Sequence, residues 1–521
     1  MGNIKVLDCT LRDGGYVNSW SFKKNNISKI LSNLVKAGID YIECGFYKPI
    51  EYEEKKSLFS SVEQLEKFMP EKFNNTKYTL MINFGEYDID KIPDCNNKNV
   101  MFRIAFKKAQ VNEAIKYCQQ LKSKGYEIFI NPMHTNTYTV FELLELIKQV
   151  NKIKPVGFTI VDTTGGMKEK DILTYFYTID SELDKKIALC FHSHNNLQLS
   201  FSNAQCLMKI CQNRELIIDS TVFGMGRGAG NLCTELITQY INDNYNGNYD
   251  IVPILKIVDE QINPIFAQTP WGYSVPYYLA ATNHCHPNYA KYLVDKQTVP
   301  VEIINQLLQT IPNNKKSGYD VNLIKQIYID NFSENIDDSE VVNKLKTILK
   351  GRKILVMASG KSISAEEQKI KDFISKENPF IISLNFVPKL YNVDLAFITN
   401  MKRFSSLENF NIPLLVTSNI ENIPQDANIL NYSSYLNDSE MYDNVALILF
   451  KLFITMGLSE VNIAGLDGWS NISSENYVSR DLINNTRDDE YDKRNIIMSQ
   501  ELKKISKKMK LNFITKTYYT I

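Results

Sequence analysis

Apolar and polar positions along the first 226 residues alternate between short strand-like runs and longer amphipathic stretches. The short runs are rich in β-branched residues, and the longer stretches repeat apolar residues at i, i+3, i+4 and i+7, as helices do. Eight such units predict a (β/α)8 barrel. A doubly wound sheet is the alternative, disfavoured because no glycine-rich turn follows the first run. The predicted strands are 4–11, 41–46, 78–84, 99–106, 126–133, 157–163, 187–194 and 217–224.

The pattern changes after the barrel, and we predict three parts in all. Residues 1–245 form the barrel, 246–340 a helical extension and linker, and 341–521 a second α/β domain. The last part alternates strand-like runs with helical ones, which predicts an open parallel sheet of Rossmann type. Its predicted strands are 353–358, 380–384, 394–399, 413–417 and 461–465.

Composition narrows the classes of function. The chain has 59 Lys and Arg against 59 Asp and Glu, so its net charge is zero, which argues against nucleic-acid binding and a polybasic membrane role. No apolar run is long enough for a membrane span, and the N-terminus lacks the apolar core of a signal peptide. Nine cysteines without a C-x-x-C pair suggest reduced thiols. We expect a cytoplasmic homo-oligomer.

Polar side chains gather at the carboxyl ends of the predicted strands, where barrel enzymes carry their chemistry. His192 and His194 are two residues apart in one strand, so both face the same side. Asp13 follows the first strand, which a closed barrel separates from the histidine strand by only one neighbour. These three side chains can bind one divalent ion and leave positions open for substrate and water.

Other interpretations of these residues stay open. An isolated His-x-His pair is often two packed imidazoles. Asn231, predicted at the same rim, is either a further ligand or a helix N-cap. Mixed oxygen and nitrogen ligands suit Mn²⁺, Mg²⁺, Co²⁺ or Zn²⁺, of which we expect Mn²⁺.

Three segments of the chain, LDCTLRDGG, FHSHNNLQLSFSNA and STVFGMGRGAGNLCTE, together resemble the DRE-TIM metallolyases, and among them the 4-hydroxy-2-oxovalerate aldolases. The segment DTTGG is similar too, and the resemblance covers roughly residues 1–290. It implies that Arg12 steadies an enolate oxygen and that Thr163 holds a substrate carboxylate. It also implies the metal ligands Asp13, His192 and His194, with Asn231 as an additional one.

One position departs from the family pattern and leaves the general base open. The aldolases commonly carry a histidine three residues after the metal-binding aspartate, and this chain has Tyr16 there. Tyr16, Glu43 or a metal-bound water are the candidates for taking the proton of the 4-hydroxyl group.

The resemblance implies a divalent-metal-dependent aldolase or lyase that makes or cleaves a carbon–carbon bond of a 4-hydroxy-2-oxo acid through a pyruvate-type enolate. We place this activity in a surface-polysaccharide or sugar pathway. One alternative is an acyl-CoA-dependent condensing transferase similar to isopropylmalate synthase. Another is an inactive barrel that serves as a scaffold for the second domain.

The segment KILVMASGKSIS predicts a strand, a glycine-containing turn and a helix start. Such a turn presents backbone N–H groups to a phosphate, although an ordinary tight turn has the same pattern. The layout of this part is similar to bacterial sialyltransferase-like and related Rossmann-type domains of surface-glycan pathways. That resemblance implies a nucleotide-sugar or phosphosugar ligand near Gly360, Ser362, Asn385 and Asp467.

Overall fold

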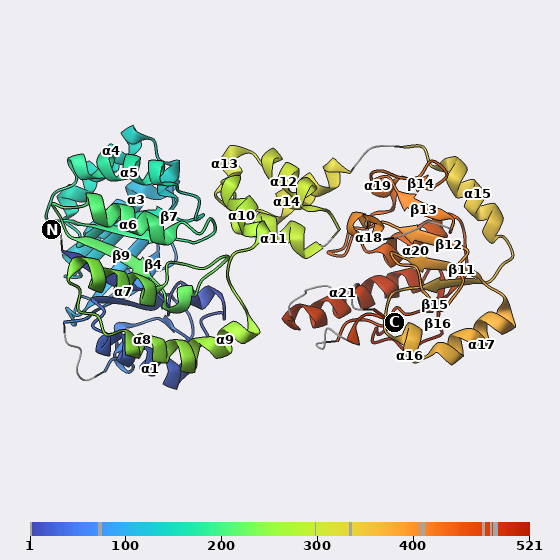
Figure 1. Cartoon of the computed structure of the whole chain (residues 1–521), viewed down its shortest axis with the longest axis horizontal. Coiled ribbons are helices and arrows are strands. Elements are labelled where there is room, and N and C mark those ends of the chain that lie inside the picture. Colours follow the sequence, from blue (N-terminus) through green and yellow to red (C-terminus); the bar gives the residue numbers. More distant parts are fainter. Residues whose placement is uncertain are drawn as a thin grey trace. The chain divides into compact units, whose positions relative to one another are not determined.

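The protein divides into two compact units, each described here by itself (Figure 1). The first comprises Met1–Pro287 with Lys316–Gly318, and the second Asn288–Lys315 with Tyr319–Ile521. The structure, a computed structural model, describes residues 3–70, 75–296, 298–332, 336–405, 407, 412–470, 475–479, 482 and 488–521.

A closed barrel of eight parallel strands forms the first unit, which confirms the predicted fold. The strand order is β1-β9-β8-β7-β6-β5-β4-β2, and β1 pairs with β2 to close the barrel. A two-residue strand, β3 (Leu58–Phe59), adds to β2 and was not predicted. The barrel strands are β1 (Ile4–Asp8), β2 (Tyr41–Tyr47), β4 (Lys77–Asn83), β5 (Val100–Phe106), β6 (Ile128–Pro132), β7 (Gly157–Asp162), β8 (Ala188–Ser193) and β9 (Leu216–Ser220).

Helices follow the strands along the chain and pack on the outside of the barrel. Helix α4 (Val140–Ile153) begins with a capping box, in which Thr139 and Glu142 each accept from the other's backbone N–H. The other helices of this unit are α1 (Lys24–Lys36), α2 (Val62–Glu66), α3 (Val111–Ser123), α5 (Glu169–Glu182), α6 (Ser200–Ile210), α7 (Thr234–Tyr245), α8 (Ile251–Ile257), α9 (Asn263–Gln268) and α10 (Val275–Thr282).

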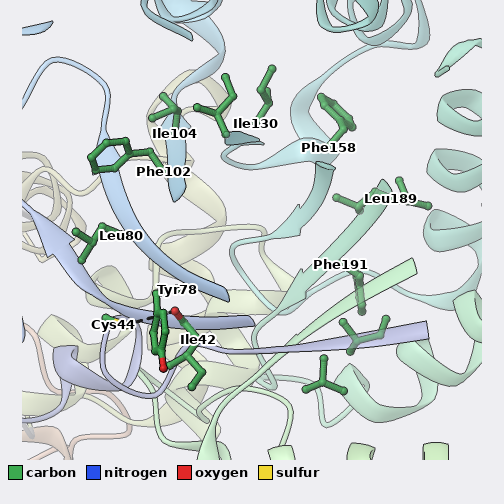
Figure 2. Close-up of a cluster of buried hydrophobic side chains, with 14 of the residues drawn as sticks. Ile42, Cys44, Tyr78, Leu80, Phe102, Ile104, Ile130, Phe158, Leu189 and Phe191 are labelled. Atoms are coloured by element: carbon green, nitrogen blue, oxygen red, sulfur yellow. Dashed lines mark hydrogen bonds between the residues drawn. The ribbon is translucent and has the colours of Figure 1, made fainter. Parts of the chain in front are cut away.

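Strand alternation divides the apolar core into two layers. One set of side chains points outward to the helices, and Figure 2 shows ten labelled members from Ile42 to Phe191. The other set fills the barrel interior and includes Tyr41, Met101 and Ile217. A residue two positions further along a strand stays on the same face, so the strand ends carry inward side chains directly above this interior layer.

The second unit contains a seven-stranded parallel sheet, as predicted for an α/β domain. Its order is β14-β13-β12-β11-β10-β15-β16, and the predicted strands are confirmed. Two short strands at the edges, β14 and β16, were missed. The strands are β10 (Ile354–Met357), β11 (Phe380–Leu384), β12 (Leu395–Ile398), β13 (Leu414–Thr417), β14 (Asn428–Leu430), β15 (Glu460–Ala464) and β16 (Lys510–Phe513).

Helices make up the beginning of the second unit, within the predicted extension. The boundary between the compact units, after Pro287, falls inside that extension, and the predicted boundaries at 245 and 340 stay predictions. Among the described residues no helix is long and apolar enough to cross a membrane. The helices are α11 (Pro287–Lys296), α12 (Val301–Thr310), α13 (Asn313–Lys316), α14 (Val321–Asn331), α15 (Ser339–Leu349), α16 (Ser362–Ala365), α17 (Glu367–Glu377), α18 (Met401–Ser405), α19 (Tyr432–Tyr435), α20 (Val445–Thr455) and α21 (Asp488–Ser506).

Candidate active site

A layer of charged side chains lies above the apolar interior of the barrel. Glu43, Arg103 and Asp219 each follow an interior apolar residue by two positions, on β2, β5 and β9. His192 follows the interior Cys190 in the same way on β8. All four side chains are buried. The alternation that builds the core therefore also directs these groups into the barrel mouth.

The structure brings together the three predicted metal ligands. Atoms Nε2 of His192 and Nε2 of His194 lie 3.8 and 3.9 Å from Oδ2 of Asp13. One ligand atom from each of the three residues lies within 4.8 Å of the others, and all three residues are buried. The loop after β1 holds Asp13 through its backbone N–H, which donates to the Cys9 carbonyl at 2.8 Å. This spacing fits one divalent ion.

The protonation states suit metal binding. Although burial alone would raise the pKa of Asp13, the Arg12 guanidinium and the two imidazoles hold it below its usual range. Burial lowers the pKa of His194 to about 3, partly opposed by Asp13, so its imidazole is neutral at pH 7. A carboxylate and a neutral imidazole are the forms that bind metal.

Asn231 lies next to Asp13 and has one oxygen without a hydrogen-bond partner among the described residues. Its Nδ2 donates to Oδ2 of Asp13 at 2.7 Å and to the Met225 carbonyl at 3.1 Å. Its Oδ1 is buried and has no hydrogen-bond partner among the described residues. The N-cap of α7 is Cys233, so the capping alternative for Asn231 is wrong. A buried amide oxygen without a donor fits a metal ligand.

Arg12 connects the metal ligands to the buried charge layer. Its Nη1 donates to Asp13 Oδ1 at 2.8 Å and its Nε donates to Glu43 Oε2 at 2.7 Å. The Trp20 indole N–H donates to the Arg12 carbonyl at 2.8 Å. Glu43 is fully buried and also lies 3.3 Å from Arg103 Nη1, so its carboxylate is held between two guanidinium groups.

Asp219 orients His192, and the sequence analysis did not single it out. Its Oδ2 lies 3.1 Å from His192 Nδ1 and accepts from Arg103 Nη2 at 2.6 Å. This contact leaves Nε2 of His192 facing Asp13, an arrangement common for metal-binding histidines. The available signal was a carboxylate directly after three apolar residues in the buried strand LIIDS.

Tyr16 and Thr163 lie at the rim of the same site. The Tyr16 side chain is 39% exposed, its ring centroid lies 4.9 Å from that of Trp20, and burial raises its pKa against the effect of Arg12. The hydroxyl oxygen of Thr163, directly after β7, accepts the His134 backbone N–H at 2.9 Å. Both side chains therefore have the exposure that substrate contact requires.

In the second unit, three of the four predicted ligand residues meet at the point where strand order reverses, between β10 and β15. The Asp467 carboxylate accepts the Ser362 backbone N–H at 2.8 Å and also its hydroxyl. A Cβ at Gly360 would lie 2.4 Å from the Gly465 carbonyl oxygen, so that position requires glycine. Asn385, after β11, accepts the Thr399 backbone N–H at 2.8 Å instead. The N–H expected to meet a phosphate is thus occupied by a carboxylate.

The barrel, the buried charge layer and the ligand triad together are typical of a metal-dependent barrel enzyme. Residues 3–259 match the HMGL-like family model, which confirms the resemblance of this part of the chain to the DRE-TIM metallolyases.

Curated relatives match about half of the chain. The chain is 23% identical over 272 residues to an oxaloacetate decarboxylase of Mycobacterium tuberculosis, and the match covers 52% of this chain and 79% of the relative. It is 24% identical over 269 residues to a 4-hydroxy-2-oxovalerate aldolase of Geobacillus genomosp. 3, covering 50% and 77%. A solved N-terminal domain of a putative aldolase from Bacteroides vulgatus is 26% identical with a TM-score of 0.48, covering 56% and 96%. The family match and the two curated relatives support a metal-dependent carbon–carbon lyase.

Proposed function

We propose that the barrel cleaves or forms the C3–C4 bond of a 4-hydroxy-2-oxo acid, with Mn²⁺ as its metal. The observation that carries this proposal is the triad of Asp13, His192 and His194 beside Arg12. A bound divalent ion supplies positive charge to the 2-oxo acid, where negative charge develops on the ketone oxygen. The enolate of pyruvate and an aldehyde are the products of cleavage.

Residues of the chain carry out the remaining steps, which are enolate stabilisation, substrate binding and proton transfer. Arg12, fixed by Asp13 and Glu43, directs its remaining N–H groups toward the developing oxyanion. Thr163 holds the substrate carboxylate at the rim. Tyr16 exchanges the proton of the 4-hydroxyl group, since it is exposed to substrate and lies near two arginines. Glu43 acts through Arg12 as a positioning residue, because its Oε2 contacts the guanidinium groups of both Arg12 and Arg103.

A pyruvate-release assay tests this function. The full chain, stripped with a chelator and reloaded with Mn²⁺, is offered a series of 4-hydroxy-2-oxo acids. Metal-dependent pyruvate release supports the proposal. Release of free CoA from acetyl-CoA with a 2-oxo acid, and no pyruvate release, would instead identify a condensing transferase.

Decarboxylation of oxaloacetate is a second candidate, favoured by the relative of that name. It breaks a different bond but leaves the same pyruvate enolate, so the same residues stabilise it. Offering oxaloacetate in the same assay, with correction for its metal-catalysed background decay, compares the two reactions directly.

Replacing Arg12 by Lys is expected to lower the turnover rate by roughly 100-fold, because one ammonium group cannot contact Asp13, Glu43 and the oxyanion together. Bound metal should stay near the native amount, since Arg12 is no ligand. Steady-state kinetics with metal analysis measures both. Near-native turnover in this variant would show that Arg12 has only a structural role.

For the second unit we retain the proposal of a nucleotide-sugar or phosphosugar ligand in a glycan pathway. Its support is the position of Gly360, Ser362 and Asp467 where the strand order reverses, a common location for ligands of parallel sheets. Calorimetry of the full chain against UDP- and CMP-sugars tests it, and heat that disappears in Asp467→Ala supports it. A panel without heat contradicts it.

A further inference from the structure

One arginine at the barrel mouth, Arg227, has no acidic partner among the described residues. Arg227 is half-buried in the glycine-rich loop between η5 (Val222–Gly224) and α7. Its guanidinium carbon lies 5.0 Å from the ring centroid of Tyr16. Across the described ranges no carboxylate forms an ion pair with Arg227, whereas Arg12 and Arg103 each contact two. A half-buried guanidinium without a counter-charge is costly unless a ligand supplies one.

The loop that carries Arg227 is held firmly in place. The Ala229 backbone N–H donates to Asn196 Oδ1 at 2.9 Å, and the Gly230 N–H donates to the Arg227 carbonyl at 3.2 Å. Gly230 has φ +84°, and a Cβ there would lie 2.1 Å from the Gly224 carbonyl oxygen. The arginine is therefore presented by a backbone that the surrounding contacts fix, as a binding residue requires.

The positive charge of Arg227 lowers the pKa of two histidines. Burial lowers the pKa of His134 to about 4 and that of His286 to about 3, and in each case Arg227 lowers it further. Both imidazoles are therefore neutral at pH 7, and neither supplies Arg227 with a counter-charge.

Arg227 and Tyr16 lie beside the predicted metal site. Arg227 stacks on Tyr16, which follows the predicted metal ligand Asp13 by three residues. The backbone N–H of His134 donates to Thr163, the residue predicted to hold the substrate's carboxylate. An anionic group bound by Arg227 is therefore close enough to belong to a molecule held at the metal.

We propose that Arg227 binds a terminal oxyanion of the aldehyde portion of the substrate, a phosphate or a carboxylate. This subsite rests on the proposed aldol chemistry and narrows its substrate class to 2-oxo acids with a second anionic end. A guanidinium makes forked contacts with either anion. The anion supplies the counter-charge that the described residues lack at Arg227.

The test measures the condensation of pyruvate with three aldehydes, using the full chain with Mn²⁺. Glycolaldehyde phosphate carries a phosphate, succinic semialdehyde a carboxylate, and propionaldehyde no charge. We expect kcat/KM for one anionic aldehyde to exceed that for propionaldehyde at least tenfold. Arg227→Gln should reduce this ratio about 10- to 100-fold, the usual effect of losing a charged hydrogen bond. The aldehyde with the larger ratio identifies the anion as phosphate or carboxylate.

Two comparisons make the result specific. Arg352→Gln removes an exposed arginine that stacks on Phe380 at 4.8 Å in the second unit, and its ratio should stay native. Bound metal in Arg227→Gln should match the native chain, because Arg227 is no ligand. A ratio that does not fall in Arg227→Gln would show that the arginine only packs on Tyr16.

Deuterium exchange of the pyruvate methyl group in D₂O separates this inference from the proposed function. Exchange reports enolate formation and needs no aldehyde. Exchange without any preference for anionic aldehydes overturns the subsite alone. Absence of metal-dependent exchange overturns the aldol function and the subsite with it.

Discussion

Replacing Asp13, His192 or His194 by Ala is expected to remove the bound metal and to lower turnover by more than about 1,000-fold, since the ion supplies several kcal/mol of charge stabilisation. Each residue provides one ligand atom of the buried triad. The fold should persist, because the barrel strands keep their apolar layers. Metal analysis, circular dichroism and the pyruvate assay measure the three quantities.

Two further variants test the ligand assignment more closely. Asp219→Asn should weaken metal affinity about 10- to 100-fold without abolishing it, because Asp219 contacts Nδ1 of His192 and so orients the ring whose Nε2 faces Asp13. His284→Asn is the matched control, since His284 is exposed and has a φ of 55° that asparagine tolerates. Full metal occupancy in His192→Ala would overturn the assignment of the ligands.

Replacing Arg103 by Met is expected to destabilise the fold by about 3–5 kcal/mol, the usual cost of removing one partner from a buried ion pair. The Arg103 side chain is fully buried and contacts both Glu43 and Asp219. The variant leaves these carboxylates in the barrel without that compensation. Urea unfolding measures the change.

The matched control for this stability experiment is Lys148→Met. Lys148 forms an exposed ion pair with Glu145, and its loss should change stability by less than about 1 kcal/mol. Equal effects of the two substitutions would show that the charge layer contributes no more than a surface pair.

Strand patterning was sufficient to predict the barrel and most of the second sheet. The predicted strands are continuous apolar runs, buried along nearly their whole length, such as VMFRIAF in β5. The missed strands β14 and β16 have three and four residues and are largely half-exposed, so they leave no such run. Edge strands of this kind form through their neighbours rather than through their own pattern.

The two histidines could be predicted from strand alternation, whereas Asp13 was predicted from its place in the loop after the first strand, from the closure of the barrel and from the family motif. The partnership of Asp219 with His192 depends on register as well. Phe191 pairs with Ile218, so the next residues on β8 and β9 are His192 and Asp219. No local pattern determines this register. The position of Arg227 depends on a loop, and loop geometry is not encoded in periodicity.

The buried charges also bear on how the chain reaches its native state during synthesis. Asp13, Arg12, Glu43, Arg103, Asp219 and His192 form a continuous circuit of contacts that joins four strands and the loop after β1. Arg103 leaves the ribosome long before Asp219, on the last strand, can meet it. A nascent chain that ends before β9 therefore cannot bury Arg103 with both partners. The circuit of buried ion pairs thus closes only when the final strand of the barrel is in place.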